Sequence, residues 1–155
     1  TGAYTVRVAG RAAHAGVEPE KGASAITELA HQILAVNALA DPAQGTTLNV
    51  GIVTGGSGRN VVPAQAVMEI DARAWTAAEA ARLDAAIAGL APATPGVQLS
   101  AAGGFGRPPM ERTPASIALF ERARAVGAGL GLTIAEGSTG GGSDGNFTAA
   151  IGVPT

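Results

Sequence analysis

Apolar residues alternate with polar or small residues in four stretches of the chain, at 4–8, 48–52, 68–74 and 97–101. This period-2 pattern is typical of strands that bury one face. The third stretch is the clearest, because its apolar residues alternate with Glu69, Asp71 and Arg73. We therefore expect the open face of the resulting sheet to carry charge and to meet solvent or a partner.

Two stretches between these strands have the apolar spacing of amphipathic helices. The first extends from Ser24 to Leu39, and the second follows a capping box at Thr76 and Glu79 and continues to Leu90. The apolar stripe of the first helix recurs at i, i+3, i+4, i+7 and i+8. Its members are Ile26, Leu29, Ala30, Ile33 and Leu34.

The elements follow the order β-α-β-β-α-β, which is the split motif of the ferredoxin-like fold. The sequence therefore predicts an α+β class, with a four-stranded antiparallel sheet and two helices on one face. The stretch GGFGRPP at 103–109 combines glycine and proline as domain boundaries often do. We place the boundary there, with a first domain at 1–104 and a second unit at 105–155.

The second unit has the pattern of a partial α/β domain. Thr113 and Pro114 have the sequence of a helix start, an apolar run at 132–135 predicts a short strand, and 146–150 predicts a helical run. The last residues, GVPT, resemble a loop that enters another strand. We expect the chain to be part of a longer protein.

Composition excludes several classes of function. Of 155 residues, 46% are hydrophobic and 14% are charged, as in a globular interior rather than a disordered chain. A net charge of −2 without a basic run gives no basis for binding nucleic acid or an anionic membrane. No stretch approaches the roughly 20 apolar residues of a membrane span. Cysteine is absent, which excludes disulfides and thiolate metal sites. The compartment is unknown, with the cytoplasm favoured over the periplasm.

His14 is the first candidate for chemistry. It lies in GRAAHAGVEPEKG, between a predicted strand and a predicted helix, and its neighbours Ala13, Ala15 and Gly16 are small. These neighbours leave the imidazole uncovered, although a lone histidine often only packs or caps. The chain has two histidines and no H-x-x-x-H or H-E-x-x-H pattern, which argues against a metal site. Packing and contact with a substrate both remain open.

The stretch GSTGGGSDGNF at 137–147 is a second candidate. Successive backbone amides can bind an anion, but the lysine of a nucleotide P-loop is missing. Ser143 lacks the G-x-S-x-G setting of a nucleophile. The stretch is therefore either a flexible turn or a carboxylate pocket with hydroxyls from Ser138, Thr139 and Ser143.

Asn60 and Arg73 complete the candidates, and each also has an ordinary structural explanation. Asn60 lies at the exit of a glycine-rich turn, where asparagine is common for backbone reasons. Arg73 lies on the charged sheet face, where an ion pair with Asp71 or Glu69 would contribute little.

Four motifs in this order resemble the zinc metallopeptidase family of carboxypeptidase G, acetylornithine deacetylase and succinyl-diaminopimelate desuccinylase. They are G-R-A-A-H-A-G, the N-V-V-P turn, D-A-R and S-T-G-G-G-S-D. The resemblance implies that 1–104 is a lid or dimerisation domain and that 105–155 returns to a catalytic domain. It also implies two zinc ions in the intact enzyme, whose ligands would all lie outside this chain.

The resemblance further implies a homodimer, joined through the lid, that hydrolyses an amide next to a free carboxylate in a small peptide or N-acyl amino acid. His14 would reach the other subunit's site and stabilise the oxyanion, while Asn60 and Arg73 would hold the carboxylate. Ser138 stands where glutamate-releasing members carry arginine, so the resemblance does not extend to glutamate specificity. The substrate pocket would be lined by Ser138, Thr139, Gly140, Gly141 and Gly142.

By itself the chain is then expected to be inactive. The alternative is a ferredoxin-like module without catalysis, which dimerises or binds a small molecule. An H-x-D pattern and a pair of glutamates upstream would distinguish the enzyme from the module.

Overall fold

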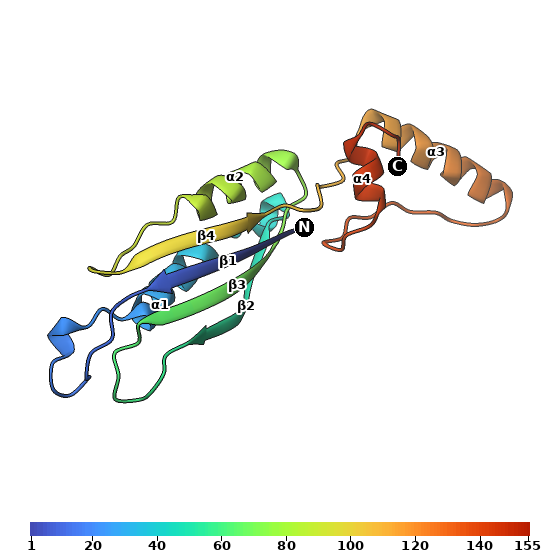
Figure 1. Ribbon diagram of the computed structural model, residues 1–155. Helices are drawn as coiled ribbons and strands as arrows, with labels where there is room; N and C mark the ends of the chain where they lie inside the picture. The colour runs from blue at the N-terminus through green and yellow to red at the C-terminus, as the bar shows by residue number, and fades with distance from the viewer.

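The computed structural model describes residues 1–155 (Figure 1). One antiparallel sheet is formed by β1 (Gly2–Ala9), β2 (Thr47–Gly55), β3 (Gln65–Arg73) and β4 (Gln98–Gly104). The helices are α1 (Ala25–Asn37), α2 (Ala77–Ala88), α3 (Pro114–Gly129) and α4 (Gly145–Ala150). Two short 3-10 turns, η1 (Pro19–Lys21) and η2 (Pro42–Gln44), lie in the loops on either side of α1.

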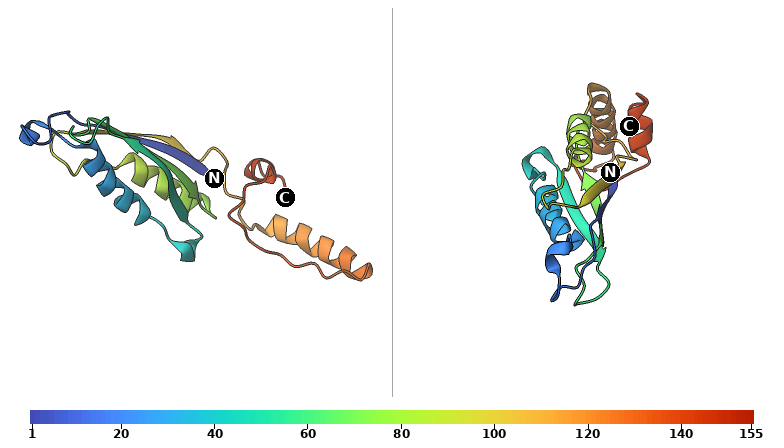
Figure 2. Two further views of the ribbon diagram at one scale, coloured as in Figure 1. Left: turned by 90° about the horizontal axis from the view of Figure 1, so that it is seen from below. Right: turned by 60° about the vertical axis from the view of Figure 1, so that its left-hand side comes forward.

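The spatial order of the strands is β2-β3-β1-β4, and every neighbouring pair is antiparallel. α1 connects β1 to β2, α2 connects β3 to β4, and both helices cover the same face of the sheet (Figure 2). This arrangement is the ferredoxin-like fold. The predicted α+β class and the β-α-β-β-α-β order are confirmed.

The core lies between the sheet and these two helices. Val6 pairs with Met68 across the centre of the sheet, and both side chains are fully buried against the helices. From the helices, Leu29 and Leu83 enter the same core. Burying each such side chain contributes about 1.5–3 kcal/mol to folding, so this layer of apolar contacts holds the sheet rigid between its two ends.

The apolar stripe predicted for α1 is displaced from the face that is buried. Leu29 is buried, but Ile26 and Leu34 are 44% and 69% exposed. Two polar residues, Glu28 and Gln32, take buried positions instead. Hydrogen bonds satisfy the Glu28 carboxylate, and Gln32 donates from Nε2 to Glu28 and to the carbonyl of Ala91, although its Oε1 has no partner. α1 therefore carries apolar side chains on an uncovered surface.

Strand β2 departs from strict alternation. The register with β3 shifts between Val50 and Ile52, which places Gly51 in a bulge. Ile52 then lies opposite Glu69, and Val53 lies opposite Met68. The expectation that Ile52 shares a face with Val50 is wrong, because the extra residue reverses the alternation.

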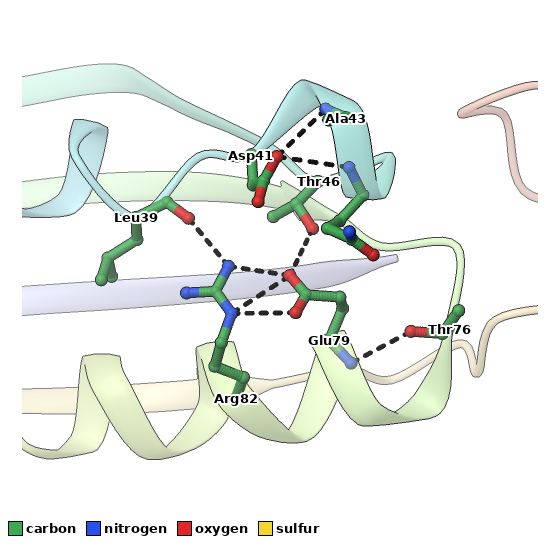
Figure 3. Close-up of polar contacts among 8 residues, drawn as sticks. Leu39, Asp41, Ala43, Thr46, Thr76, Glu79 and Arg82 are labelled. Carbon is green, nitrogen blue, oxygen red and sulfur yellow. Dashed lines mark hydrogen bonds and ion pairs between the residues drawn. The ribbon is translucent and has the colours of Figure 1, made fainter.

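The capping box predicted at Thr76 forms only in part. Thr76 Oγ1 accepts a hydrogen bond from the Glu79 amide at 3.2 Å. The Glu79 carboxylate instead accepts bonds from Thr46 Oγ1 at 2.7 Å and from Arg82, which also donates to the carbonyl of Leu39 (Figure 3). Glu79 therefore ties α2 to the loop after α1 rather than closing its own helix.

Residues 105–155 lie beyond one end of the sheet (Figure 1). A true capping box between Thr113 and Ser116 begins α3, and Pro114 occupies its first turn as predicted. The strand expected at 132–135 is wrong, since this segment is irregular and no other strand lies beside it to pair with. No helix is both long and apolar enough to cross a membrane.

Candidate functional site

The candidate residues form two groups at opposite ends of the sheet. His14 and Asn60 lie in the loops that precede α1 and β3, and we call this pair the tip cluster. Arg73 ends β3 and contacts the glycine loop at 138–142, and we call this group the hinge cluster. β3 has nine residues, so at about 3.3 Å per step its first and last residues lie about 26 Å apart, with the tip cluster beyond one end and the hinge cluster at the other. Within one chain the structure does not bring all candidates together.

Backbone pairing fixes the tip cluster. His14 forms an antiparallel bridge with Val61. The amide of Ala15 donates to the carbonyl of Asn60 at 2.9 Å, and the amide of Val62 donates to the carbonyl of Ala13 at 2.9 Å. Two loops far apart in the sequence thus carry His14 and Asn60 as neighbours.

The hydrogen bonding of His14 defines the position of its proton. The amide of Gly16 donates to Nδ1 at 3.2 Å, so Nδ1 of the neutral ring must be the unprotonated nitrogen. The proton then lies on Nε2, which makes no hydrogen bond within the chain. The side chain is exposed. It therefore presents a free N–H donor to whatever approaches the tip.

Asn60 also has an uncommitted side chain. The residue is exposed, and only its backbone carbonyl is hydrogen-bonded. Apart from glycine, no residue in the chain has a positive φ, so Asn60 does not occupy the left-handed conformation for which turns often select asparagine. Its carboxamide is free to bind a ligand.

Arg73 forms the ion pair expected for a charged sheet face. Its Nε and Nη2 donate to the two carboxylate oxygens of Asp71 at 2.6 and 2.8 Å. These hydrogen bonds raise the pKa of Arg73 above its ordinary value, so the guanidinium stays charged. Nη1 donates to the carbonyl of Gly140 at 3.1 Å. Of the five N–H groups of arginine, one on each terminal nitrogen is left for a ligand.

A cleft of about 840 Å³ opens beside this arginine. It lies between the end of β3, the start of α3 and the glycine loop. Within the loop, Thr139 Oγ1 accepts a hydrogen bond from the amide of Gly141 at 3.2 Å. Gly142 does not line the cleft. The wall of the cleft includes Arg73, Trp75, Met110, Phe120, Ser138, Thr139, Gly140 and Gly141.

Two residues that fasten the glycine loop escaped sequence reasoning. Asn146 is 9% exposed, accepts a hydrogen bond from the amide of Ser143 at 2.9 Å and donates to the carbonyl of Pro108 at 2.7 Å. Arg107 lies against the same loop and pairs with Asp144 at 3.3 Å. Local signals could not reveal how they hold the loop to the rest of the chain, because the contacts Asn146–Pro108 and Arg107–Asp144 join residues 38 and 37 positions apart.

The chain does not provide a metal site. No three side chains of His, Asp or Glu converge so that they could hold a metal ion. The residues of this chain therefore do not fit the zinc ions that the resemblance implies, and their ligands would have to come from elsewhere.

Comparison with known proteins agrees with the fold and the motifs. Residues 2–96 match the family model described as a peptidase dimerisation domain. Over 71 residues the chain is 42% identical to one subunit of the p-aminobenzoyl-glutamate hydrolase of Escherichia coli, a match that covers 45% of this chain and 16% of that protein. Over 68 residues it is 34% identical to carboxypeptidase G2 of a Pseudomonas species, covering 44% of this chain and 16% of that protein.

Among solved structures, aminopeptidase PepT from Bacillus cereus superposes with a TM-score of 0.77 at 26% identity. The match covers 99% of this chain and 41% of PepT, so the chain spans less than half the length of this neighbour. The match of the family model extends over more than half of the chain, and it includes β1 to α2. The resemblance inferred from the four motifs is thus confirmed, and the chain belongs to the family of peptidase dimerisation domains.

Proposed function

We propose that residues 1–104 are the lid and dimerisation domain of a two-zinc exopeptidase or amidohydrolase, and that 105–155 belong to its catalytic domain. The observation that carries this proposal is the division of the candidate residues between the tip and the hinge. Each cluster has unused hydrogen-bond donors, yet neither is complete. A second copy of the chain would supply the missing half.

The free edge of β2 supports such a dimer. β2 pairs only with β3, and its Val53, which lies opposite Met68 on the face that the helices cover, is 52% exposed. On the same side of the sheet, α1 exposes the apolar surface that carries Ile26 and Leu34. Pairing of two β2 edges around a two-fold axis would extend the sheet and cover both surfaces.

In such a dimer, the direction of β2 would bring the clusters of two copies together. The strand begins with Thr47, opposite Arg73 at the hinge, and ends with Gly55, near the tip. In an antiparallel pair, the Gly55 end of one copy lies against the Thr47 end of the other. The tip cluster of one copy then approaches the hinge cluster of its partner, which offsets the separation along β3.

The chemistry of the two clusters fits an amide beside a free carboxylate. The Nε2–H of His14 is a suitable donor to the oxyanion that forms when water attacks an amide. The two remaining N–H groups of Arg73, with the carboxamide of Asn60, can bind a carboxylate. Ser138, Thr139, Gly140 and Gly141 would orient the substrate from the loop, whereas Gly142, also expected from the resemblance, does not line the cleft. Any zinc ion would have to be bound by residues outside this chain.

We infer a small peptide or an N-acyl amino acid as the substrate. The names of relatives support this class, since p-aminobenzoyl-glutamate hydrolase and an indole-3-acetyl-aspartic acid hydrolase of Enterobacter agglomerans, 41% identical over 68 residues, both denote N-acyl amino acids. Ser138 in place of arginine points to an amino acid other than glutamate.

The proposal includes a cytoplasmic location, which fractionation of the producing cells would test.

Mixing two inactive variants of the complete protein tests the shared site. His14→Ala should lower turnover by about 10²–10³-fold through loss of an oxyanion donor, and Arg73→Ala should abolish carboxylate binding. If one site needs His14 from one copy and Arg73 from the other, mixed dimers contain one intact site. Equal mixing should then restore about a quarter of wild-type turnover, because half of the dimers are mixed.

A matched control uses two variants of the tip. Mixing His14→Ala with Asn60→Ala should restore nothing, because each mixed dimer has a defective tip at both sites. Failure of the first mixture to regain turnover would contradict a shared site. A wild-type protein without hydrolysis of any N-acyl amino acid would favour the alternative, a module without catalysis.

A further inference from the structure

The three consecutive glycines of the loop are not equivalent. A Cβ atom at Gly140 would meet nothing within 4 Å, and one at Gly141 would lie 3.6 Å from Thr139 Oγ1, an ordinary contact. A Cβ atom at Gly142 would lie 2.6 Å from Nη1 and 2.9 Å from Cδ of Arg107. None of the three has a positive φ. Of the three, only Gly142 has a neighbour so close that a Cβ atom would force it to move, and that neighbour is the side chain of Arg107.

Arg107 is well placed to hold the loop. It lies in the connection between β4 and α3, where its amide donates to the carbonyl of Thr1 at 3.2 Å and so joins the start of β1. Its guanidinium lies against Gly142, donates from Nη2 to Asp144 at 3.3 Å and is centred 5.3 Å from the ring of Phe147. One side chain therefore contacts the end of the glycine loop and the start of α4.

These contacts complement those of Arg73. Arg73 fastens the middle of the loop to β3 through the carbonyl of Gly140, whereas Arg107 fastens its end to the connection after β4. β3 and β4 flank β1 in the same sheet. The loop is thus held from β3 and from the connection that follows β4, and its position relative to Arg73 depends on both arginines.

We propose that Arg107 is a positioning residue, which sets the glycine loop so that its amides and Arg73 face one carboxylate. The consequence for binding rests on the proposed function, but the effect on the loop does not. The ion pair contributes less than the packing, because the side chain of Asp144 is 96% exposed and therefore strongly solvated. Contact with Gly142 and Phe147 is less sensitive to salt.

Amide hydrogen exchange in the 155-residue chain tests the effect on the loop. Arg107→Met keeps most of the aliphatic volume but removes the guanidinium, and it should accelerate exchange at 139–146 by about 3–10-fold. Exchange in β1 and β3 should stay unchanged, which separates local positioning from general loss of stability. Arg107→Lys should restore only part of the protection, because it keeps the charge but not the planar group over Phe147. Unchanged exchange at 139–146 in Arg107→Met would overturn the proposal.

Alanine at the glycines provides a matched pair. Gly142→Ala should displace the guanidinium and reproduce the effect of Arg107→Met, while Gly140→Ala, whose Cβ meets nothing, should not change exchange. When Arg107→Met is already present, Gly142→Ala should add nothing further. Equal effects of the two alanines, or additive effects of Gly142→Ala and Arg107→Met, would contradict the role of Arg107.

Binding of a carboxylate separates this inference from the proposed function. Trp75 is the only tryptophan and lines the cleft, so its fluorescence reports binding of hippurate, an N-acyl amino acid. Arg107→Met should weaken hippurate binding about 3–10-fold, matching the exchange result. Wild-type affinity in Arg107→Met would contradict the positioning role. Absence of hippurate binding in the wild-type chain would count against the proposed function, while the exchange experiment would still decide the role of Arg107.

Discussion

At the scale of single residues, Glu28 shows how a buried charge can be stabilised. Its side chain is fully buried and accepts hydrogen bonds from the amide of Thr94 at 2.6 Å, from the amide of Ala93 and from Gln32 Nε2 at 2.6 Å. Burial by itself raises the pKa of this carboxyl, but the hydrogen bonds from Gln32, Thr94 and Ala93 outweigh it and lower the pKa. The charged form thus ties α1 to the loop before β4.

Replacing this carboxylate should change both stability and its dependence on pH. Because the folded pKa is below the unfolded value of about 4.3, Glu28 stabilises the fold above that value and loses its contribution as the pH falls through the folded pKa. Glu28→Gln should lower the free energy of unfolding at pH 7 by about 2–3 kcal/mol and weaken the loss of stability below pH ~4.3. Urea unfolding at pH 7 and at acid pH measures both effects.

The control for this change is Glu20→Gln. Glu20 is exposed, so its replacement should leave the unfolding free energy within about 0.5 kcal/mol. Equal effects of the two substitutions would contradict a special role for Glu28.

Sequence reasoning could not find Glu28, because its backbone partners lie 65 and 66 residues away. The exposure of His14, in contrast, follows from its small neighbours, and the structure confirms that exposure.

At the scale of elements, the sequence predicts which segments are strands and helices better than which faces they bury. The helical period of α1 is correct, but the buried face includes Glu28 and Gln32 rather than Ile26 and Leu34. Glu28 can replace an apolar residue in the core because the amides of Ala93 and Thr94 bond its carboxylate, and periodicity carries no information about such distant partners. The bulge at Gly51 has a similar origin, since only pairing with β3 defines the register.

The contact of Thr46 with Glu79 makes a prediction at this scale. Thr46 is fully buried, and its hydroxyl joins the loop after α1 to the first turn of α2 (Figure 3). Thr46→Val keeps the shape but removes the hydroxyl, and it should lower the melting temperature by about 2–4 °C. Thr47→Val, on the exposed start of β2, should change it by less than about 1 °C. Thermal unfolding followed by circular dichroism distinguishes the two.

At the scale of the whole molecule, the fold is predictable from the order of elements, but the arrangement of the candidate site is not. The motifs place His14, Asn60, Arg73 and the glycine loop along one chain, and nothing in their spacing reveals that β3 keeps the tip and the hinge apart. That separation depends on the register of the sheet. Because the candidate residues lie at opposite ends of the sheet, a site that uses all of them needs two copies of the chain.

The proposed pairing of two copies predicts a dimer that depends on the apolar surface of α1. Leu34 is 69% exposed on this helix, so Leu34→Glu should not disturb the fold of a single copy. In the dimer it would bury a carboxylate on each side of the two-fold axis, and it should weaken association by at least about tenfold. Val126→Glu is the matched control, because Val126 is 66% exposed and belongs to α3, which lies far from β2 (Figure 1). Analytical ultracentrifugation should find dimers for the wild-type chain and Val126→Glu, and monomers for Leu34→Glu at the same concentration. A Leu34→Glu chain that remains a dimer would contradict the proposed interface, and with it the approach of the tip of one copy to the hinge of the other.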